Sequence, residues 1–349
     1  MVVLNKHKFM FLLSSCIALL LRAMHADCEK IGVNYGLNGD NLPAPGDAAS
    51  LVKRNNIGKA RIFLANHDIL KAFANSGIDI IVGVDNSELQ AVASSQDSAN
   101  GWVNDNVKAF YPSTNIKYIA VGNEVLGMPI NTQYVPYLVP AILNIQTALE
   151  TANLQNNIKV STAHAMTVIG TGFPPSQGTF KDTVKYSMIS ILQFLQDHAS
   201  PFMANVHPYH SYDDNRKFIA LEYALFKPTP LVKDGNLSYT NLFDAMVDTL
   251  ISAMGSLGHP DLPIMITETG WPSAGKDVAT IENAQTYNNN LIKHVLSKTG
   301  TPKRPGRSID TYIFALFNED LKTYAETEKH WGLFYPNGQP VYPVNFSPN

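Results

Sequence analysis

Three glutamates that each follow an apolar run are the residues of this sequence best suited to chemistry. Glu124 ends the run IKYIAVGNE, Glu268 lies in LPIMITETG, and Glu319 ends DTYIFALFNE. Each carboxyl group would lie at the edge of a core of low dielectric constant, where its ionisation can be tuned. Two carboxyl groups that face each other across a cleft can hydrolyse a glycosidic bond, because one protonates the leaving oxygen while the other attacks the anomeric carbon or activates a water. A single such acid more commonly caps a helix or pairs with a base, so the pairing of Glu124 with Glu268 is what favours catalysis.

Eight short β-rich runs must position these residues. The runs are continuously apolar rather than alternating, which is typical of strands that are covered on both faces in a parallel sheet. We predict strands at residues 31–36, 59–64, 78–84, 116–124, 158–164, 201–208, 262–270 and 310–319.

Helical periodicities lie between these runs. The clearest spans residues 243–254, where apolar residues recur at intervals of three and four. Thr240 is expected to cap the start of this helix, and Gly255 is expected to end it. Similar patterns predict helices around 138–149 and 284–295. Because strand and helix alternate eight times, the sequence predicts an α/β fold with a single (β/α)8 or TIM barrel.

Two segments depart from this alternation. Residues 211–240 are polar and rich in turn residues, and we expect them to form a small elaboration on the loop after the sixth strand. Residues 330–346 are dense in proline and aromatic residues, and we expect them to close over the rim of the barrel. In such barrels the active site lies at the carboxyl ends of the strands, so the three glutamates should meet at one mouth.

The composition of the 349-residue chain excludes several classes of protein. It is 45% hydrophobic and 16% charged, with a formal net charge of −3, which excludes intrinsic disorder. Two cysteines cannot build a disulfide scaffold. Because the sequence contains no basic run, it is not expected to bind nucleic acid.

Residues 1–26 are predicted to be a signal peptide. A basic start precedes an apolar stretch at 9–21, which has about the length of a signal-peptide core and is too short to span a membrane. An uncleaved anchor is the alternative. Cleavage after Ala26 would leave residues 27–349 as the catalytic domain, with 23 bases against 29 acids, a net charge of −6, and Cys28 as its one cysteine.

Several segments resemble one known family in the same order along the chain. The segment ITETGWPSAG at 266–275 is similar to the signature of glycoside hydrolase family 17, the plant β-1,3-glucanases. IGVNYG, VGNEV, FPPSQGTF, FALFNED and GLFYPNGQPVYPVNF also resemble segments of that family. The resemblance covers about residues 30–346 and implies a barrel glycosidase.

The resemblance also implies roles for individual residues. Glu268 matches the catalytic nucleophile and Glu124 the general acid/base, which implies a retaining mechanism. Asn123 is expected to hydrogen-bond near the nucleophile and the 2-hydroxyl of the sugar. The further residues expected to contact substrate are Tyr35, Tyr209, Trp271, Glu319, Lys322, Glu328 and Phe334. This chemistry requires no metal and no other cofactor.

Two segments depart from the family pattern. The chain has Phe-Leu-Ala-Asn at 63–66 and His-Pro-Tyr-His at 207–210. We expect both segments to face the cleft and to affect fine specificity. His207 and His210 are read as polar cleft residues rather than metal ligands. His164, at the end of the fifth predicted strand, is either a hydrogen-bonding group in the cleft or a residue of the rim.

The expected function is that of a secreted, endo-acting, retaining hydrolase of β-1,3-glucan, such as callose or fungal-wall glucan. A β-1,3-1,4-glucanase and a non-catalytic glucan-binding wall protein are the alternatives. The expected partner is the polysaccharide alone, with no nucleic acid and no membrane anchor in the mature chain, which is expected to be a monomer. The leader, together with sequons at Asn236 and Asn345, predicts secretion to the apoplast or cell wall.

Overall fold

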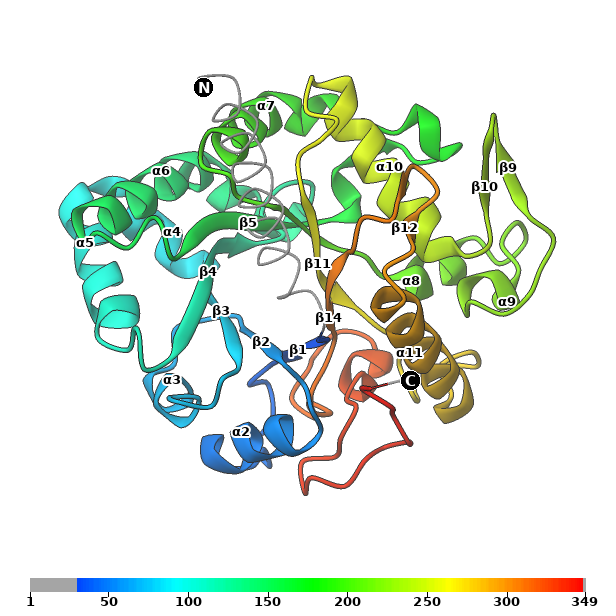
Figure 1. Cartoon of the computed structure of the whole chain (residues 1–349), viewed down its shortest axis with the longest axis horizontal. Coiled ribbons are helices and arrows are strands. Elements are labelled where there is room, and N and C mark those ends of the chain that lie inside the picture. The colour runs from blue at the N-terminus through cyan, green and yellow to red at the C-terminus, as the bar shows by residue number, and fades with distance from the viewer. Residues whose placement is uncertain (1–29, 348–349) are drawn as a thin grey trace, which may run out of the picture.

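The computed structural model describes residues 30–347, so the predicted signal peptide lies outside the described part of the chain. Eight parallel strands form a closed barrel in the order β1-β14-β11-β8-β5-β4-β3-β2, surrounded by helices (Figure 1). The barrel strands are β1 (Gly32–Tyr35), β2 (Lys59–Ile62), β3 (Asp79–Val84), β4 (Asn115–Asn123), β5 (Lys159–Ala165), β8 (Phe202–Asn205), β11 (Ile264–Thr269) and β14 (Asp310–Ile313). The predicted TIM barrel is therefore confirmed.

The strands begin within two residues of their predicted starts, but the last one ends early. β14 stops at Ile313, whereas the apolar run predicted a strand up to residue 319. The chain changes its hydrogen-bonding partner at this point. The N–H of Ala315 donates to the carbonyl of Trp331 at 2.9 Å, and the N–H of Leu333 donates to the carbonyl of Ala315 at 2.8 Å. The C-terminal segment, and not a barrel strand, thus satisfies the backbone after β14.

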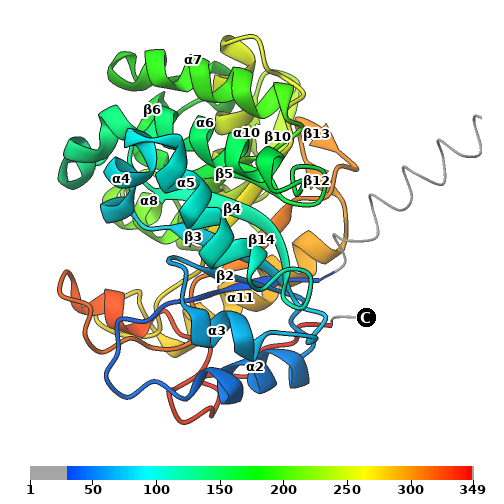
Figure 2. The same ribbon diagram turned by 90° about the vertical axis from the view of Figure 1, so that its left-hand side faces the viewer.

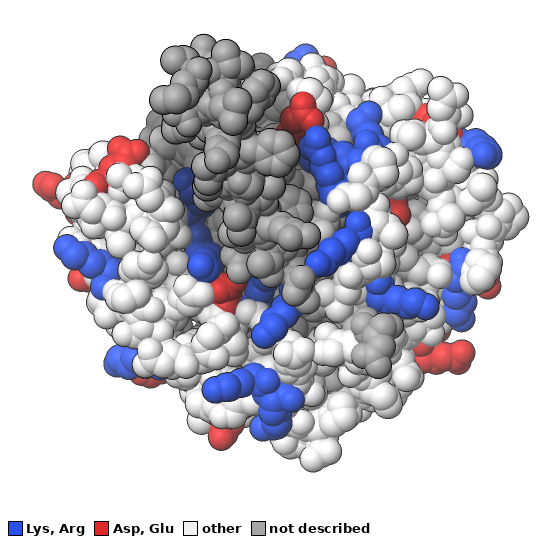
Figure 3. All heavy atoms as spheres, in the orientation of Figure 1, with Lys and Arg blue, Asp and Glu red and all other residues white. Residues whose placement is uncertain are grey.

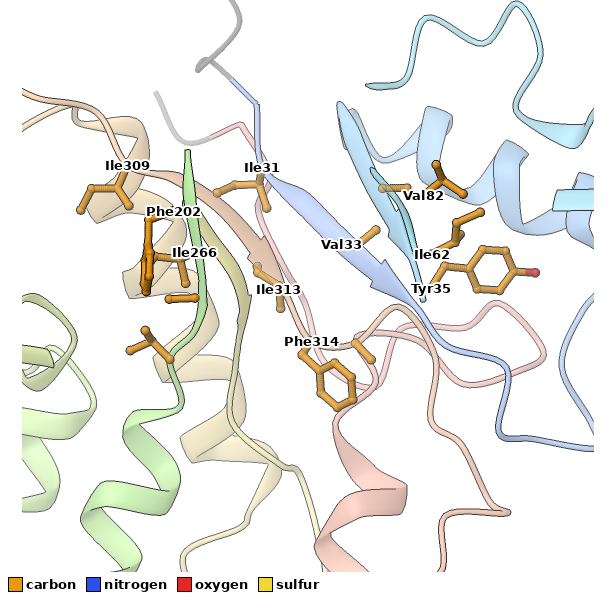
Figure 4. Packing of buried hydrophobic residues seen from close by; sticks show 14 of the residues in the cluster. Ile31, Val33, Tyr35, Ile62, Val82, Phe202, Ile266, Ile309, Ile313 and Phe314 are labelled. Atoms are coloured by element: carbon orange, nitrogen blue, oxygen red, sulfur yellow. The ribbon is translucent and has the colours of Figure 1, made fainter. Parts of the chain in front are cut away.

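Alternate residues of the strands enter two separate apolar clusters. The barrel interior is filled by Ile81, Ala120, Ala163, Met203, Met265 and Tyr312. Outward-pointing residues such as Val33, Ile266 and Ile313 join the larger cluster that the strands share with the helices (Figure 4). At Gly32 a Cβ atom would lie 2.3 Å from the Tyr312 ring, so the glycine makes room for that ring. Because both faces of each strand are buried, the runs show no polar alternation.

Ten α-helices are assigned within residues 30–347. They are α2 (Pro45–Arg54), α3 (His67–Ala72), α4 (Leu89–Ser94), α5 (Gln96–Val103), α6 (Val135–Thr151), α7 (Asp182–Asp197), α8 (Pro208–Asp214), α9 (Leu221–Ala224), α10 (Leu242–Ser256) and α11 (Ile281–Leu296). The three helices predicted from periodicity are α6, α10 and α11. Asn241 caps α10 in place of the predicted Thr240, because its side chain accepts a hydrogen bond from the Asp244 N–H at 2.8 Å. No helix in this part of the chain is long and apolar enough to cross a membrane.

The insert after β8 is a small elaboration, as predicted. It contains α8, α9 and a hairpin of β9 (Val232–Asp234) and β10 (Leu237–Tyr239). Ser176 ties this hairpin to the preceding part of the chain, because its N–H and hydroxyl both donate to Asp234 at 2.6 Å.

The prediction for the C-terminal segment is only partly right. Phe334 bridges to Phe317 beside the barrel mouth, but the chain then runs along the outside of the barrel. Tyr342 accepts a hydrogen bond from Asn288 on α11, and Ser347 accepts one from Asn56 after α2. The segment therefore packs against these two helices instead of closing over the rim.

A buried carboxyl group on α10 links three elements outside the barrel. Asp248 accepts hydrogen bonds from the Tyr239 hydroxyl at 3.0 Å and from the Lys303 N–H at 2.8 Å. Its side chain is fully buried. Burial raises the pKa of Asp248 to about 6, against the opposing effect of its hydrogen bonds.

This carboxyl group makes stability depend on pH. The folded pKa lies above the unfolded value, so the folded state binds the proton more tightly, and that stabilisation is lost as pH rises from about 4 through 6. The free energy of unfolding, measured with urea at several pH values, should fall over this range in the wild type. In Asp248→Asn the fall should be smaller by up to about 3 kcal/mol. Asp182→Asn, which removes an exposed acid of α7, should keep the wild-type slope. If the free energy of unfolding changed with pH in the same way in wild type and Asp248→Asn, the prediction would be contradicted.

Candidate active site

The carboxyl ends of the barrel strands surround a cleft of about 650 Å³. Glu124 directly follows β4, Glu268 lies near the end of β11, and Glu319 lies in the loop after β14; all three line the cleft. Figure 2 shows the barrel from the side, with the loops that follow β1 and β14 together at this end of the molecule, on the left. The predicted meeting of three glutamates at one mouth is therefore observed.

Arg61 of β2 is the positive charge at the centre of the site. Its side chain is 1% exposed and points into the end of the barrel. Its Nη1 donates to Glu268 Oε1 at 2.9 Å, to Asn205 Oδ1 at 3.1 Å and to the Thr267 carbonyl at 3.2 Å. Its Nη2 donates to Asn123 Oδ1 at 2.7 Å. One guanidinium group therefore ties together the ends of β4, β8 and β11.

Asn205, the last residue of β8, contacts both candidate catalytic carboxyl groups. Its Nδ2 lies 2.8 Å from Glu124 Oε1 and 2.8 Å from Glu268 Oε1. The two oxygens therefore cannot be farther apart than twice that distance. The Oδ1 of Asn205 accepts from Arg61 and from the Thr267 hydroxyl, which fixes the orientation of the amide.

The environment of Glu268 favours its charged form. Burial alone would raise the pKa of this carboxyl group, but the charge of Arg61 and the nearby His207 and Lys322 outweigh burial and lower the pKa. Oε1 of Glu268 is held by Arg61 and Asn205. Oε2 lies 3.6 Å from Nε2 of His207, which also lines the cleft. The ionised form of Glu268 is thus favoured, and Arg61 and Asn205 anchor only one of its two oxygens.

The environment of Glu124 has the opposite effect. Burial, and then the charge of Glu268, raise the pKa of Glu124, and the hydrogen bond from Asn205 only partly offsets them. The residue adopts a left-handed backbone conformation, with φ of 52°, held by a hydrogen bond from its N–H to the Ala163 carbonyl at 2.9 Å. Such a conformation is uncommon outside glycine and is often found at functional sites. The protonated form of Glu124 is therefore favoured beside the carboxylate of Glu268.

Glu319 forms a second polar group at the side of the cleft. Its Oε1 accepts from the Asn38 N–H at 2.8 Å, and its Oε2 lies 3.7 Å from Lys322 Nζ. Gly36 is required beside it, because a Cβ atom there would lie 2.3 Å from Glu319 Oε1. Lys322 also lies over the ring of Phe314, 4.9 Å from its centroid.

Most of the predicted site residues line the cleft. Those that do so are Tyr35, Asn123, Glu124, Glu268, Glu319, Lys322 and Glu328. The two departures from the family pattern also contribute: Phe63 and Leu64 line the cleft from one segment, and His207 and His210 from the other. Asn66 instead caps α3, accepting from the N–H groups of Asp68 and Ile69.

Three predicted substrate-binding residues lie behind the cleft wall, which corrects the sequence-based assignment. Trp271 is fully buried, and its indole N–H donates to the Val278 carbonyl at 2.8 Å. The ring of Tyr209 packs edge-on against Trp271 and Trp331 and is 2% exposed. Phe334 is buried where the C-terminal segment packs beside α2. A sequence motif gives the position of an aromatic residue along the chain, but it does not show on which side of the cleft wall the ring is buried.

His164 likewise lies outside the cleft. It stacks on Phe202 with ring centroids 5.0 Å apart, and burial lowers its pKa to about 3. The residue is therefore a neutral imidazole of the barrel wall.

Sequence reasoning missed Arg61, Asn205 and Trp331. Arg61 and Asn205 each had a usable signal, because a charged and an amide side chain stand inside the apolar runs KARIFL and PFMANV. A polar group in a buried strand must be hydrogen-bonded, so it marks a polar site. Trp331, which lines the cleft, had no such signal, since it reaches the cleft only through the pairing of the C-terminal segment with residues 315–316.

Charged side chains divide between the two ends of the barrel. Five acids line the cleft, namely Asp85, Glu124, Glu268, Glu319 and Glu328, whereas Lys322 is the one lysine or arginine among the lining residues that the structure describes. Figure 3 shows the opposite end, where the strands begin, and lysine and arginine gather around the centre of that face. The cleft would therefore repel a polyanion and is suited to an uncharged ligand.

Comparison with known sequences agrees with this geometry. Residues 31–346 match the family model described as Glycosyl hydrolases family 17. A glucan endo-1,3-beta-glucosidase of Vitis vinifera is 46% identical over 320 residues, which cover 91% of this chain and 92% of that protein. Glucan endo-1,3-beta-glucosidase 3 of Arabidopsis thaliana is 47% identical over 325 residues, which cover 91% of this chain and 64% of that protein.

Solved structures agree as well. CJP38, described as a β-1,3-glucanase and allergen of Cryptomeria japonica pollen, is 77% identical with a TM-score of 0.91; the match covers 92% of this chain and 100% of that one. One of two plant β-glucan endohydrolases described as having distinct substrate specificities is 41% identical with a TM-score of 0.85, covering 90% of this chain and 100% of that one.

A closed parallel barrel with a part-buried glutamate directly after β4 and a buried glutamate near the end of β11 is the architecture of a barrel glycoside hydrolase. Within that class the chain belongs to glycosyl hydrolases family 17, because the family match extends over nearly the whole described chain.

Removing the charge of Arg61 should show how strongly Glu268 depends on it. In Arg61→Met the buried Glu268 loses its main positive partner, so the pKa of Glu268 should rise and the acidic limb of the hydrolysis pH profile should shift to higher pH. We expect kcat/KM at the optimum to fall by roughly two orders of magnitude. In Arg61→Lys the acidic limb of the pH profile should stay closer to its wild-type position, because the positive charge remains. An unshifted limb in a folded Arg61→Met protein would show that other groups keep Glu268 ionised.

Proposed function

We propose that this chain is an endo-acting hydrolase that cleaves β-1,3-glucan with retention of configuration. The observation that carries the proposal is the pair of glutamates that share the Asn205 amide, with the pKa of one raised and that of the other lowered. Retaining glycosidases hold their two carboxyl groups roughly 5–5.5 Å apart, and contact with one nitrogen is compatible with that separation. Such a pair supplies an acid and a nucleophile at the same pH.

Each glutamate has a step in the proposed reaction. Glu124 donates its proton to the glycosidic oxygen as the bond to the anomeric carbon breaks, and Glu268 attacks that carbon through Oε2, the oxygen that Arg61 and Asn205 do not hold. A covalent glycosyl-enzyme results. Glu124, now a carboxylate, then takes a proton from a water that attacks the same carbon and releases Glu268. Arg61 and Asn205 hold Oε1 throughout and stabilise the carboxylate when it leaves.

The cleft suits a long, uncharged polysaccharide. Its walls come from residues that lie at or after the ends of all eight barrel strands, so a chain can cross the mouth and be cut internally. The preference for β-1,3 linkages is inferred from the named relatives, which are glucan endo-1,3-beta-glucosidases. Callose and fungal-wall glucan are the expected natural substrates, and the predicted leader supports secretion to the wall or apoplast.

A β-1,3-1,4-glucanase is the second candidate. One solved relative is described as one of two plant endohydrolases with distinct substrate specificities. Phe63, Leu64, His207 and His210 depart from the expected pattern and line the cleft, where they can affect which linkage is accepted. A purely glucan-binding role is less well supported, because both glutamates retain their partners.

Azide can test the roles of the two glutamates separately. Glu268→Ala and Glu124→Ala should each lower the rate on laminarin by several orders of magnitude, because each removes one half of the two-carboxylate chemistry. Azide is then added as an external nucleophile, with a laminaribioside that carries an activated aryl leaving group as substrate. With Glu268→Ala azide attacks in place of the missing carboxylate and should give the α-glycosyl azide. With Glu124→Ala it attacks the glycosyl-enzyme in place of water, without need of a general base, and should give the β-glycosyl azide; both are assigned by NMR.

Glu282→Ala, which removes an exposed acid in the first turn of α11, is the matched control and should retain the wild-type rate. If the anomers were exchanged between the two variants, the assigned roles would be reversed. Inversion of configuration by the wild-type enzyme would exclude the covalent intermediate.

A panel of defined glucans can test the linkage preference. We expect sugar release from laminarin to exceed release from mixed-linkage cereal β-glucan by at least tenfold in kcat/KM, measured as new reducing ends. Cleavage of the mixed-linkage polymer alone would support the second candidate. Wild-type protein that binds laminarin without releasing sugar would support the binding role instead.

A further inference from the structure

Tyr324 presents an aromatic ring to the cleft with no protein group covering most of it. The side chain lines the cleft and is 76% exposed, in the loop between β14 and the C-terminal segment. Leu37 and Leu64 also line the cleft, and each is more than a third exposed. The three residues follow β14, β1 and β2, which are consecutive strands in the barrel. They therefore form an exposed apolar wall on one side of the mouth.

The loop that carries Tyr324 is fixed at both ends. Before it, the Leu321 N–H donates to the Asn38 carbonyl at 3.0 Å, and the Asn38 N–H donates to Glu319. After it, the Glu328 N–H donates to the Ala325 carbonyl at 2.9 Å. The loops that follow β1 and β14 are thus joined, which keeps the loop that carries Tyr324 beside the cleft.

The wall lies to one side of the two glutamates. The nucleophile Glu268 lies on β11, which is the direct neighbour of β14. The acid Glu124 follows β4, which β3 separates from β2 at the other end of the wall. The wall therefore spans the part of the mouth between the strands of the two glutamates, where sugars beyond the cleaved bond can reach it.

We propose that Tyr324, with Leu37 and Leu64, forms a stacking subsite for glucosyl units that lie beyond the bond that is cleaved. The face of a glucose ring that presents C–H groups can pack on the tyrosine ring, while the phenol hydroxyl stays in contact with water or a sugar hydroxyl. The subsite rests on the proposed glucanase function and adds to it a determinant of chain length. A substrate too short to reach Tyr324 gains nothing from it.

The test compares Tyr324→Ala, Tyr324→Phe and a matched control, Tyr186→Ala, on laminarihexaose labelled at its reducing end and on laminaritriose. Tyr186 lies on α7, is 86% exposed and does not line the cleft. We expect Tyr324→Ala to raise KM for the hexasaccharide by roughly three- to tenfold with little change in kcat, from the loss of one ring contact. The trisaccharide should be affected less. Tyr324→Phe and Tyr186→Ala should behave as wild type, and all four proteins should melt at similar temperatures.

The labelled products give the direction. Weakening a subsite on the non-reducing side lets the hexasaccharide bind farther toward the reducing side, so cleavage moves toward the non-reducing end and the labelled fragments become longer. Shorter labelled fragments would instead place the subsite on the reducing side, and fragment lengths equal to those of the wild type would overturn the proposal. Equal KM values for Tyr324→Ala and Tyr186→Ala would show that no subsite exists, while leaving the glucanase function intact. A wild-type protein that cleaves no β-glucan would instead overturn both the function and the subsite.

Discussion

The buried ion pair between Arg61 and Glu268 is the interaction on which the site depends. Two charges are removed from water inside the end of the barrel, which is costly unless every polar atom around them finds a partner. Asn123, Asn205 and the Thr267 carbonyl supply partners for the two Nη atoms of Arg61, whereas its Nε makes no hydrogen bond within residues 30–347. Because these groups come from four strands, the charged pair also fixes how the ends of β2, β4, β8 and β11 lie relative to one another.

The same arrangement separates the behaviour of two chemically identical side chains. Glu268 lies directly against the guanidinium and is kept ionised, whereas the stronger influences on Glu124 are burial and the negative charge of Glu268. Asn205 contacts both and therefore sets their spacing. The reaction needs two glutamates whose pKa values differ. That difference arises from the environment they share, and not from either side chain by itself.

The C-terminal segment has a structural and a functional effect at once. Its pairing with residues 315–316 satisfies the backbone where β14 ends early, and it places Trp331 in the cleft wall. Trp331 packs against His207, His210 and Tyr209, so the segment also supports the loop after β8. The C-terminal segment therefore affects both the point at which β14 ends and the shape of the cleft wall.

The sequence by itself determined the barrel, the approximate start of every barrel strand and the convergence of Glu124, Glu268 and Glu319, because apolar runs buried on both faces and polar residues at their ends are local patterns. It could not place Tyr209, Trp271 and Phe334, since the face on which a ring is buried depends on neighbours distant in the chain. It also did not reveal that Arg61 holds Glu268, a contact across 207 positions. Only the tertiary structure decided that the pKa of Glu268 is lowered and that of Glu124 raised, because ionisation depends on burial and on nearby charges that folding brings together.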